Sequence, residues 1–197
     1  MHADLCTDET LASLDSLSRQ AVAVGEIGLD YQIPSPSREE QQMAFRRQLH
    51  IALRHRLPVL LHCRRAFQDL LQILAEECGN GVKGVMHAFS GSPEVANICI
   101  QRGLYISVSG SATWQKAAKP VRVIRAIPLE NLLLETDAPD LTPEPYRRQS
   151  NKPAFLVEIA RKVAEIKEVS LEEVMKVTTS NADRLFRLSS PGNTAVN

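Results

Sequence analysis

The stretch "LPVLLHCRRAFQDLLQILAEECG", residues 57–79, contains two patterns in immediate succession. It begins with a short, uniformly apolar segment, 57–63, which is typical of a strand buried on both faces of a parallel sheet. Segment 66–78 then has apolar residues at helical spacing, and Gly79 stands where a helix usually ends. A strand followed at once by a helix is the repeating unit of α/β proteins.

The same unit occurs five times along the chain, with no change of composition that would mark a domain boundary. An additional helix is predicted at each end, over 7–20 and from 170 to about 186. We therefore expect one domain over residues 1–188 and a disordered tail over 189–197. The predicted strands lie in 21–31, 57–63, 83–91, 104–110 and 131–139, and the predicted helices that follow them lie in 38–56, 66–78, 92–103, 117–127 and from 153 onward.

Parallel strands covered by helices form either a (β/α) barrel or an open, doubly wound sheet. The usual reason for the open sheet is a nucleotide, but no glycine-rich dinucleotide loop or P-loop follows any predicted strand. Polar residues gather at the ends of the strands instead, as they do in barrels. The sequence therefore predicts an α/β fold of the TIM-type (β/α) barrel kind.

Composition excludes several classes of protein. The 197 residues are 44% hydrophobic, and 23 basic residues balance 23 acidic ones, so no overall charge attracts nucleic acid or a membrane. The four cysteines form no C-x-x-C pair, and no segment resembles a signal peptide or a membrane span. We expect a cytoplasmic protein with reduced thiols, no membrane contact and no obligate protein partner.

Four residues of metal-binding types stand near the predicted ends of four strands: Glu26, His62, His87 and Asp137. The carboxyl ends of barrel strands meet at one mouth, so these side chains can surround one site. Each also has a simpler explanation: a histidine can be a hydrogen-bonded core residue, Asp137 can form a turn before Pro139, and Glu26 can accept backbone donors. The joint arrangement favours a metal site, which would also explain why a buried run ends on carboxylates.

Several motifs resemble the TatD family of metal-dependent deoxyribonucleases, which are amidohydrolase-like barrels. They are "VGEIGLDY", "PVLLHCRRA", "HAFSGS" and "LLLETDAP", followed by "NKP" at 151–153. The resemblance covers residues 20–187 and implies a 3′-to-5′ exonuclease of single-stranded or frayed DNA. It implies two divalent ions, Mg²⁺, Mn²⁺ or Zn²⁺, bound by Glu26, His62, His87 and Asp137, with Glu26 bridging them. We expect Asp137 and Glu26 to be catalytic, with Asp137 orienting or deprotonating the nucleophile.

Substrate contacts are predicted around the same mouth. Arg64 occupies the family's His-x-Arg position and is assigned to the substrate phosphate, whereas Arg65 is equally well explained as a surface charge. We expect Arg64 and Arg65 to open a helix, where a phosphate is welcome. The remaining candidates are Ser90 and Gly91, whose backbone donors can cradle an anion, Trp114, which suits base stacking or simple burial, and the basic loop residue Arg148.

A TatD-like barrel has eight strands, and its first strand ends in a His-x-His pair. This chain has five predicted strands and His2 as its only early histidine, so we expect a barrel incomplete at its N-terminus. The missing pair would weaken one metal site, so that this chain could hold one ion where the family holds two, and would impair activity. Two alternatives to a nuclease remain: a metal-dependent hydrolase of a small ester or amide, and a non-catalytic remnant.

Overall fold

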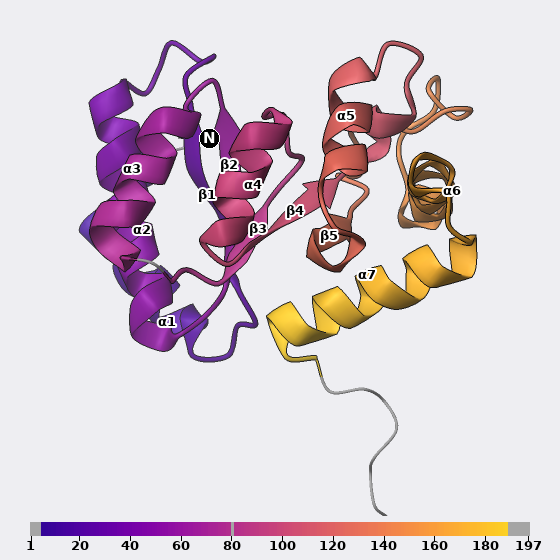
Figure 1. The fold of residues 1–197 in the computed structure, drawn as a ribbon. Helices are drawn as coiled ribbons and strands as arrows, with labels where there is room; N and C mark the ends of the chain where they lie inside the picture. Colours follow the sequence, from indigo (N-terminus) through magenta and orange to yellow (C-terminus); the bar gives the residue numbers. More distant parts are fainter. Residues whose placement is uncertain (1–4, 80, 189–197) are drawn as a thin grey trace, which may run out of the picture.

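The computed structural model describes residues 5–79 and 81–188 (Figure 1). The predictions for His2 and for the tail at 189–197 lie outside these residues. The strands are β1 (Val24–Asp30), β2 (Val59–Arg64), β3 (Gly84–Met86), β4 (Leu104–Val108) and β5 (Leu132–Leu134). The α-helices are α1 (Asp8–Ser18), α2 (Arg38–His55), α3 (Phe67–Cys78), α4 (Pro93–Gln101), α5 (Ala118–Ala126), α6 (Leu156–Lys167) and α7 (Leu171–Phe186).

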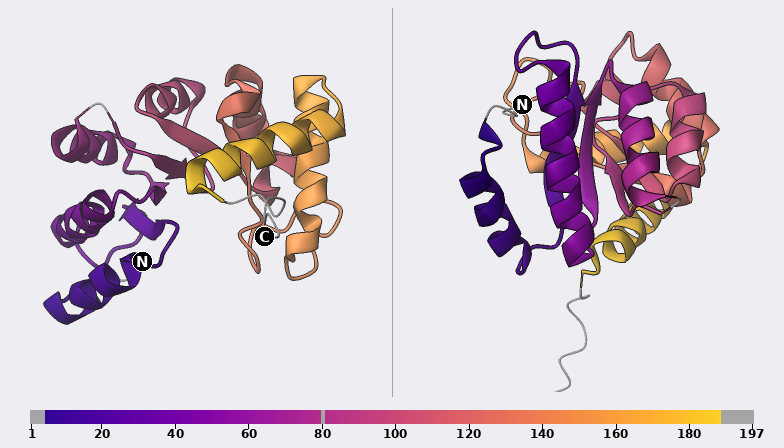
Figure 2. Two further views of the ribbon diagram at one scale, coloured as in Figure 1. Left: turned by 90° about the horizontal axis from the view of Figure 1, so that it is seen from below. Right: turned by 90° about the vertical axis from the view of Figure 1, so that its left-hand side faces the viewer.

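All five strands are parallel and lie side by side in chain order, β1-β2-β3-β4-β5. A doubly wound sheet would reverse its strand order at a switch point, which this sheet does not. Figure 2 shows the helices fanned around the strands as in an arc of a barrel, with β1 and β5 at its two edges. The predicted α/β fold with five strand–helix units is confirmed.

Local sequence signals set where the helices begin. Thr7 caps α1 by accepting a hydrogen bond from the backbone of Thr10, and Ser37 forms a full capping box with Glu40 at the start of α2. Ser170 caps α7, as its sequence pattern predicts. Among the described residues, no helix is both long enough and apolar enough to cross a membrane.

The two faces of the sheet bury different side chains. Alternate strand residues such as Leu61, Met86 and Ile106 belong to the main core, which the sheet forms with helices α2 to α7. On the opposite face, Val85 and Leu133 pack against Leu185 of α7 in a smaller cluster. Helix α7 crosses beside β5 (Figure 1) and so covers part of this second face.

Several boundaries differ from the prediction: β3 and β5 are shorter than the segments 83–91 and 131–139 in which they were expected. Glu26 does not end its strand, because β1 continues to Asp30. Arg64 and Arg65 do not open a helix: Arg64 is the last residue of β2, and α3 begins only at Phe67. The helix expected from Pro153 starts as a short 3₁₀ turn, η4 (Pro153–Phe155), and becomes α-helical at Leu156.

Candidate metal centre

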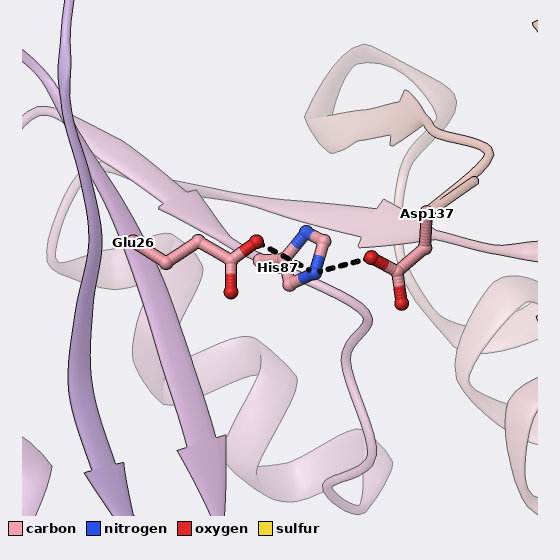
Figure 3. A group of neighbouring side chains, drawn as sticks. All are labelled: Glu26, His87 and Asp137. Atoms are coloured by element: carbon pink, nitrogen blue, oxygen red, sulfur yellow. Dashed lines mark ion pairs between the residues drawn. The ribbon is translucent and has the colours of Figure 1, made fainter. Parts of the chain in front are cut away.

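Three predicted ligands lie together on the second face of the sheet: Glu26 in β1, His87 directly after β3, and Asp137 in the loop after β5. One ligand atom from each lies within 4.8 Å of the others. The Nε2 atom of His87 is 3.2 Å from Oε1 of Glu26 and 3.3 Å from Oδ1 of Asp137 (Figure 3). Strands far apart in sequence thus bring an imidazole and two carboxylates to one point.

Glu135 fixes the orientation of His87 from the other side of the ring. Its Oε2 lies 2.9 Å from Nδ1 of His87 and also accepts a hydrogen bond from the Ser107 hydroxyl. Its Oε1 accepts a hydrogen bond of 2.9 Å from the backbone of Ala88. A carboxylate on one ring nitrogen sets the tautomer of a histidine and leaves the other nitrogen free to bind a metal.

His87 dominates the electrostatics of the site. Only 12% of its side chain is exposed. Burial alone would disfavour the charged ring, but the hydrogen bond to Glu135 and the charges of Glu135, Glu26 and Asp137 outweigh it. Together they raise the pKa of His87 from 6.5 to about 9. The pKa of Asp137 is also raised, chiefly by burial and then by the neighbouring carboxylates, against the opposing effect of His87.

His62 lies beside this cluster. Its Nδ1 is 4.0 Å from Oε2 of Glu26, while its Nε2 is 3.2 Å from Oδ2 of Asp30. Glu26 therefore directs one oxygen toward His87 and the other toward His62. Asp30 is 8% exposed and has this histidine as its partner, which explains how the second carboxylate of β1 is accommodated.

The donor set fits a divalent cation. One imidazole nitrogen and two carboxylate oxygens suit Zn²⁺, Mn²⁺ or Mg²⁺, and 46% of the Glu26 side chain and 32% of that of Asp137 remain exposed. Asp137 has a φ angle of 58°, in the left-handed region that non-glycine residues seldom adopt. Such conformations cluster at functional sites, where the surrounding structure holds them.

The predicted phosphate contacts have unequal structural support. Arg64 is exposed, and its guanidinium makes no hydrogen bond or ion pair with any residue in 5–79 or 81–188. Ser90 is exposed too, and its hydroxyl donates weakly to the carbonyl of Cys63, at 3.5 Å. At Gly91 a Cβ atom would lie 2.4 Å from the ring of Phe89, so close packing accounts for that glycine without an anion.

Trp114 lies on the loop after β4, where its indole Nε1 donates to the carbonyl of Thr142 at 2.9 Å. The guanidinium of Arg147 covers one face of the ring, 3.8 Å from its centroid. That face is therefore occupied, which removes it from the predicted base stacking. Arg148 is exposed on the same loop as Arg147.

Sequence reasoning missed Glu135, which orients His87, and the residue that pairs with Asp30. Glu135 follows Leu133 by two residues and so shares its face of the sheet, which was the available signal. The role of Asp30 as partner of His62 had no sequence signal, because it depends on the pairing of Asp30 with Arg64 in the β1–β2 register.

Comparison with known families agrees with this geometry. The model of the family described as TatD related DNase matches residues 2–187. The chain belongs to this family. The TatD resemblance of the motifs is thereby confirmed.

Relatives in the TatD family extend the comparison. The "Uncharacterized metal-dependent hydrolase YabD" of Bacillus subtilis is 42% identical over 93% of this chain and 72% of its own length. The "3'-5' ssDNA/RNA exonuclease TatD" of Citrobacter rodentium is 34% identical over 93% of this chain and 71% of its own. This chain spans 72% of the length of YabD and 63% of the length of the "Uncharacterized metal-dependent hydrolase YcfH" of Escherichia coli, to which it is 40% identical.

The crystal structure of YjjV, a TatD homologue from Escherichia coli, superposes with a TM-score of 0.86 at 34% identity. The match covers 96% of this chain and 75% of the YjjV chain. The chain is thus a TatD-family protein of the metal-dependent hydrolase kind.

Proposed function

We propose that this chain is a metal-dependent deoxyribonuclease that removes nucleotides from the 3′ end of single-stranded or frayed DNA. The observation that carries the proposal is the cluster of Glu26, His87 and Asp137 within 4.8 Å. The printed name of the Citrobacter relative supports the choice of nucleic acid as substrate. A cytoplasmic location is part of the proposal and is supported by four free cysteines.

Each residue has a distinct task. Glu26, His62, His87 and Asp137 would hold the divalent cations, and the two oxygens of Glu26 face the two histidines. When bound, such ions stabilise charge on the phosphoryl oxygens during phosphodiester hydrolysis. Asp137, a carboxylate of this cluster, receives a proton from the attacking water.

The phosphate-binding residues of the proposal are Arg64, Ser90 and Gly91. Arg64 is an exposed cation at the end of β2, two residues from His62, and can pair with the scissile phosphate through charge-assisted hydrogen bonds. Gly91 packs against the ring of Phe89, so it can contact a phosphate only through its backbone. In this proposal Arg148 and Trp114 contact the strand beyond the scissile phosphate.

The test is degradation of single-stranded oligonucleotides labelled at the 5′ or the 3′ end, with Mg²⁺ or Mn²⁺ and with EDTA. We expect shortening from the 3′ end that EDTA abolishes, and a loss of about 10²–10⁴-fold in Asp137→Asn. Glu144→Gln is the control, since Glu144 is an exposed carboxylate on the same loop. Its rate should equal that of the unchanged chain.

Two results would contradict the proposal. One is metal-loaded protein that leaves DNA intact yet hydrolyses small esters or amides, which would favour the alternative hydrolase. The other is protein that binds metal and hydrolyses none of these substrates, which would favour the non-catalytic alternative. Impaired activity stays a prediction, and assaying the Bacillus subtilis relative beside this chain checks it.

A further inference from the structure

The loop between β5 and α6 carries an arginine that the metal centre does not use. Arg147 lies flat over the indole of Trp114, with its guanidinium carbon 3.8 Å from the ring centroid. It forms no ion pair with a carboxylate in residues 5–79 or 81–188. A cation held on an aromatic face, with its N–H groups unpaired, is suited to an anion in the plane of the guanidinium.

The ring beneath Arg147 is itself fixed. The indole N–H donates to the carbonyl of Thr142 at 2.9 Å, and the hydroxyl of Thr113 accepts from the backbone of Glu144 at 2.8 Å. At Gly110 a Cβ atom would lie 1.9 Å from the carbonyl oxygen of Leu141, so only glycine permits this approach. The loops after β4 and β5 are therefore joined into one surface.

The backbone of Arg147 is held as well. The backbone N–H groups of Tyr146 and Gln149 donate to the carbonyls of Pro143 and Tyr146, each at 2.8 Å, which gives two successive turns. The ring of Tyr146 stacks on Phe155 with 4.1 Å between centroids and 6° between planes. The guanidinium is therefore presented from an ordered segment.

The same loop carries the candidate ligand Asp137. Asn151 is 5% exposed and donates from Nδ2 to the carbonyls of Thr136 and Asp140, each at 2.6 Å. These two bonds close the loop around Asp137. Trp114 bonds to Thr142, which lies in the same closed loop, so the Arg147–Trp114 stack and Asp137 are carried by one structural unit.

We propose that Arg147, supported by Trp114, is a phosphate subsite that holds a backbone phosphate of the single-stranded substrate outside the metal centre. This inference rests on the proposed nuclease function. It changes the expected role of Trp114 from a base platform to the support of a phosphate-binding cation. Such a contact strengthens binding of an oligonucleotide without taking part in bond cleavage.

Trp114 also supplies the measurement, because it is the only tryptophan in the 197 residues. Binding of oligothymidylate should change the fluorescence of Trp114. With EDTA present to prevent hydrolysis, this change reports binding alone. In Arg147→Gln we expect about tenfold weaker binding. The slope of log affinity against log salt should fall by about 0.7, as for the loss of one phosphate contact to a single strand. Anisotropy of a labelled oligonucleotide gives the same affinities independently of the indole.

Two controls separate phosphate binding by Arg147 from a general effect of charge and from an effect on the metal centre. Arg125→Gln makes the same charge change in the last turn of α5, outside the joined loops, and should leave affinity and salt slope unchanged. Metal-dependent hydrolysis of bis(p-nitrophenyl) phosphate, a small phosphodiester, reports on the metal centre alone. Its rate and the thermal midpoint should be the same in Arg147→Gln as in the unchanged chain.

If Arg147→Gln and Arg125→Gln changed DNA affinity and its salt slope equally, the proposal of a phosphate subsite at Arg147 would be wrong. So would a parallel fall in DNA affinity, small-substrate rate and thermal midpoint, because that pattern indicates a structural role for the stack. Failure of the nuclease proposal is distinguishable, since the unchanged chain would then hydrolyse neither DNA nor the small phosphodiester.

Discussion

At the scale of single residues, the decisive feature is one imidazole surrounded by three carboxylates. His87 contacts Glu26 and Asp137 through Nε2 and Glu135 through Nδ1. Without metal, these charges hold a proton on the ring, so its pKa is about 9 in the folded chain against 6.5 as the ordinary value. A group whose pKa is raised on folding stabilises the fold below its unfolded pKa and loses that contribution as pH rises through the folded value.

We therefore expect the free energy of unfolding of the metal-free protein to fall between pH 6.5 and 9, by at most about 3 kcal/mol from His87. Glu135→Gln removes the main favourable partner of the charged ring and should flatten this fall. Urea denaturation in EDTA at a series of pH values measures this free energy of unfolding for both proteins. Glu144→Gln, an exposed change, serves as control. The same pH dependence in Glu135→Gln and the unchanged chain would show that Glu135 does not set the charge of His87.

At the scale of elements, the loop from β5 to α6 positions a ligand through a buried amide. Asn151→Ala removes the hydrogen bonds that hold the carbonyls of Thr136 and Asp140, at a cost of about 1–3 kcal/mol in stability. Because Asp137 lies between these carbonyls, we expect Mn²⁺ affinity to fall about tenfold as well, a loss within the range typical of supporting residues. Calorimetric titration and thermal unfolding measure the two effects, with exposed Ser150→Ala as control. Reduced stability with unchanged metal affinity would contradict the positioning role.

At the scale of the whole molecule, one core joins the sheet to its helices. Cys63 in β2 and Cys99 in α4 both lie in it, 7% and 0% exposed, and burial raises the pKa of each thiol to about 12. Cys6 and Cys78 are only partly buried. We expect a thiol reagent such as DTNB at pH 8 to label Cys6 and Cys78 in the native protein and Cys63 and Cys99 only on global unfolding. Labelling of all four at one rate without denaturant would show that the core opens locally.

The sequence by itself determined the order of the elements and the class of the fold. Uniformly apolar strands such as 57–63 and the glycine after 66–78 are local signals, and each acts within a few residues of itself. They sufficed to predict five parallel strands, and the polar residues near the strand ends, such as Glu26, His87 and Asp137, were the candidates for a metal centre.

Only the tertiary structure decided which of those residues meet. His87 and Glu135 are 48 positions apart, and Asp30 and His62 are 32 apart, so their pairing depends on strand register and on which face each residue takes. The same holds for Arg147, which the fold places on Trp114. Local patterns fix helices and strands because their hydrogen bonds and periodicities are short-range. Contacts between strand ends arise only when the sheet curves and aligns them, which no short stretch of sequence encodes.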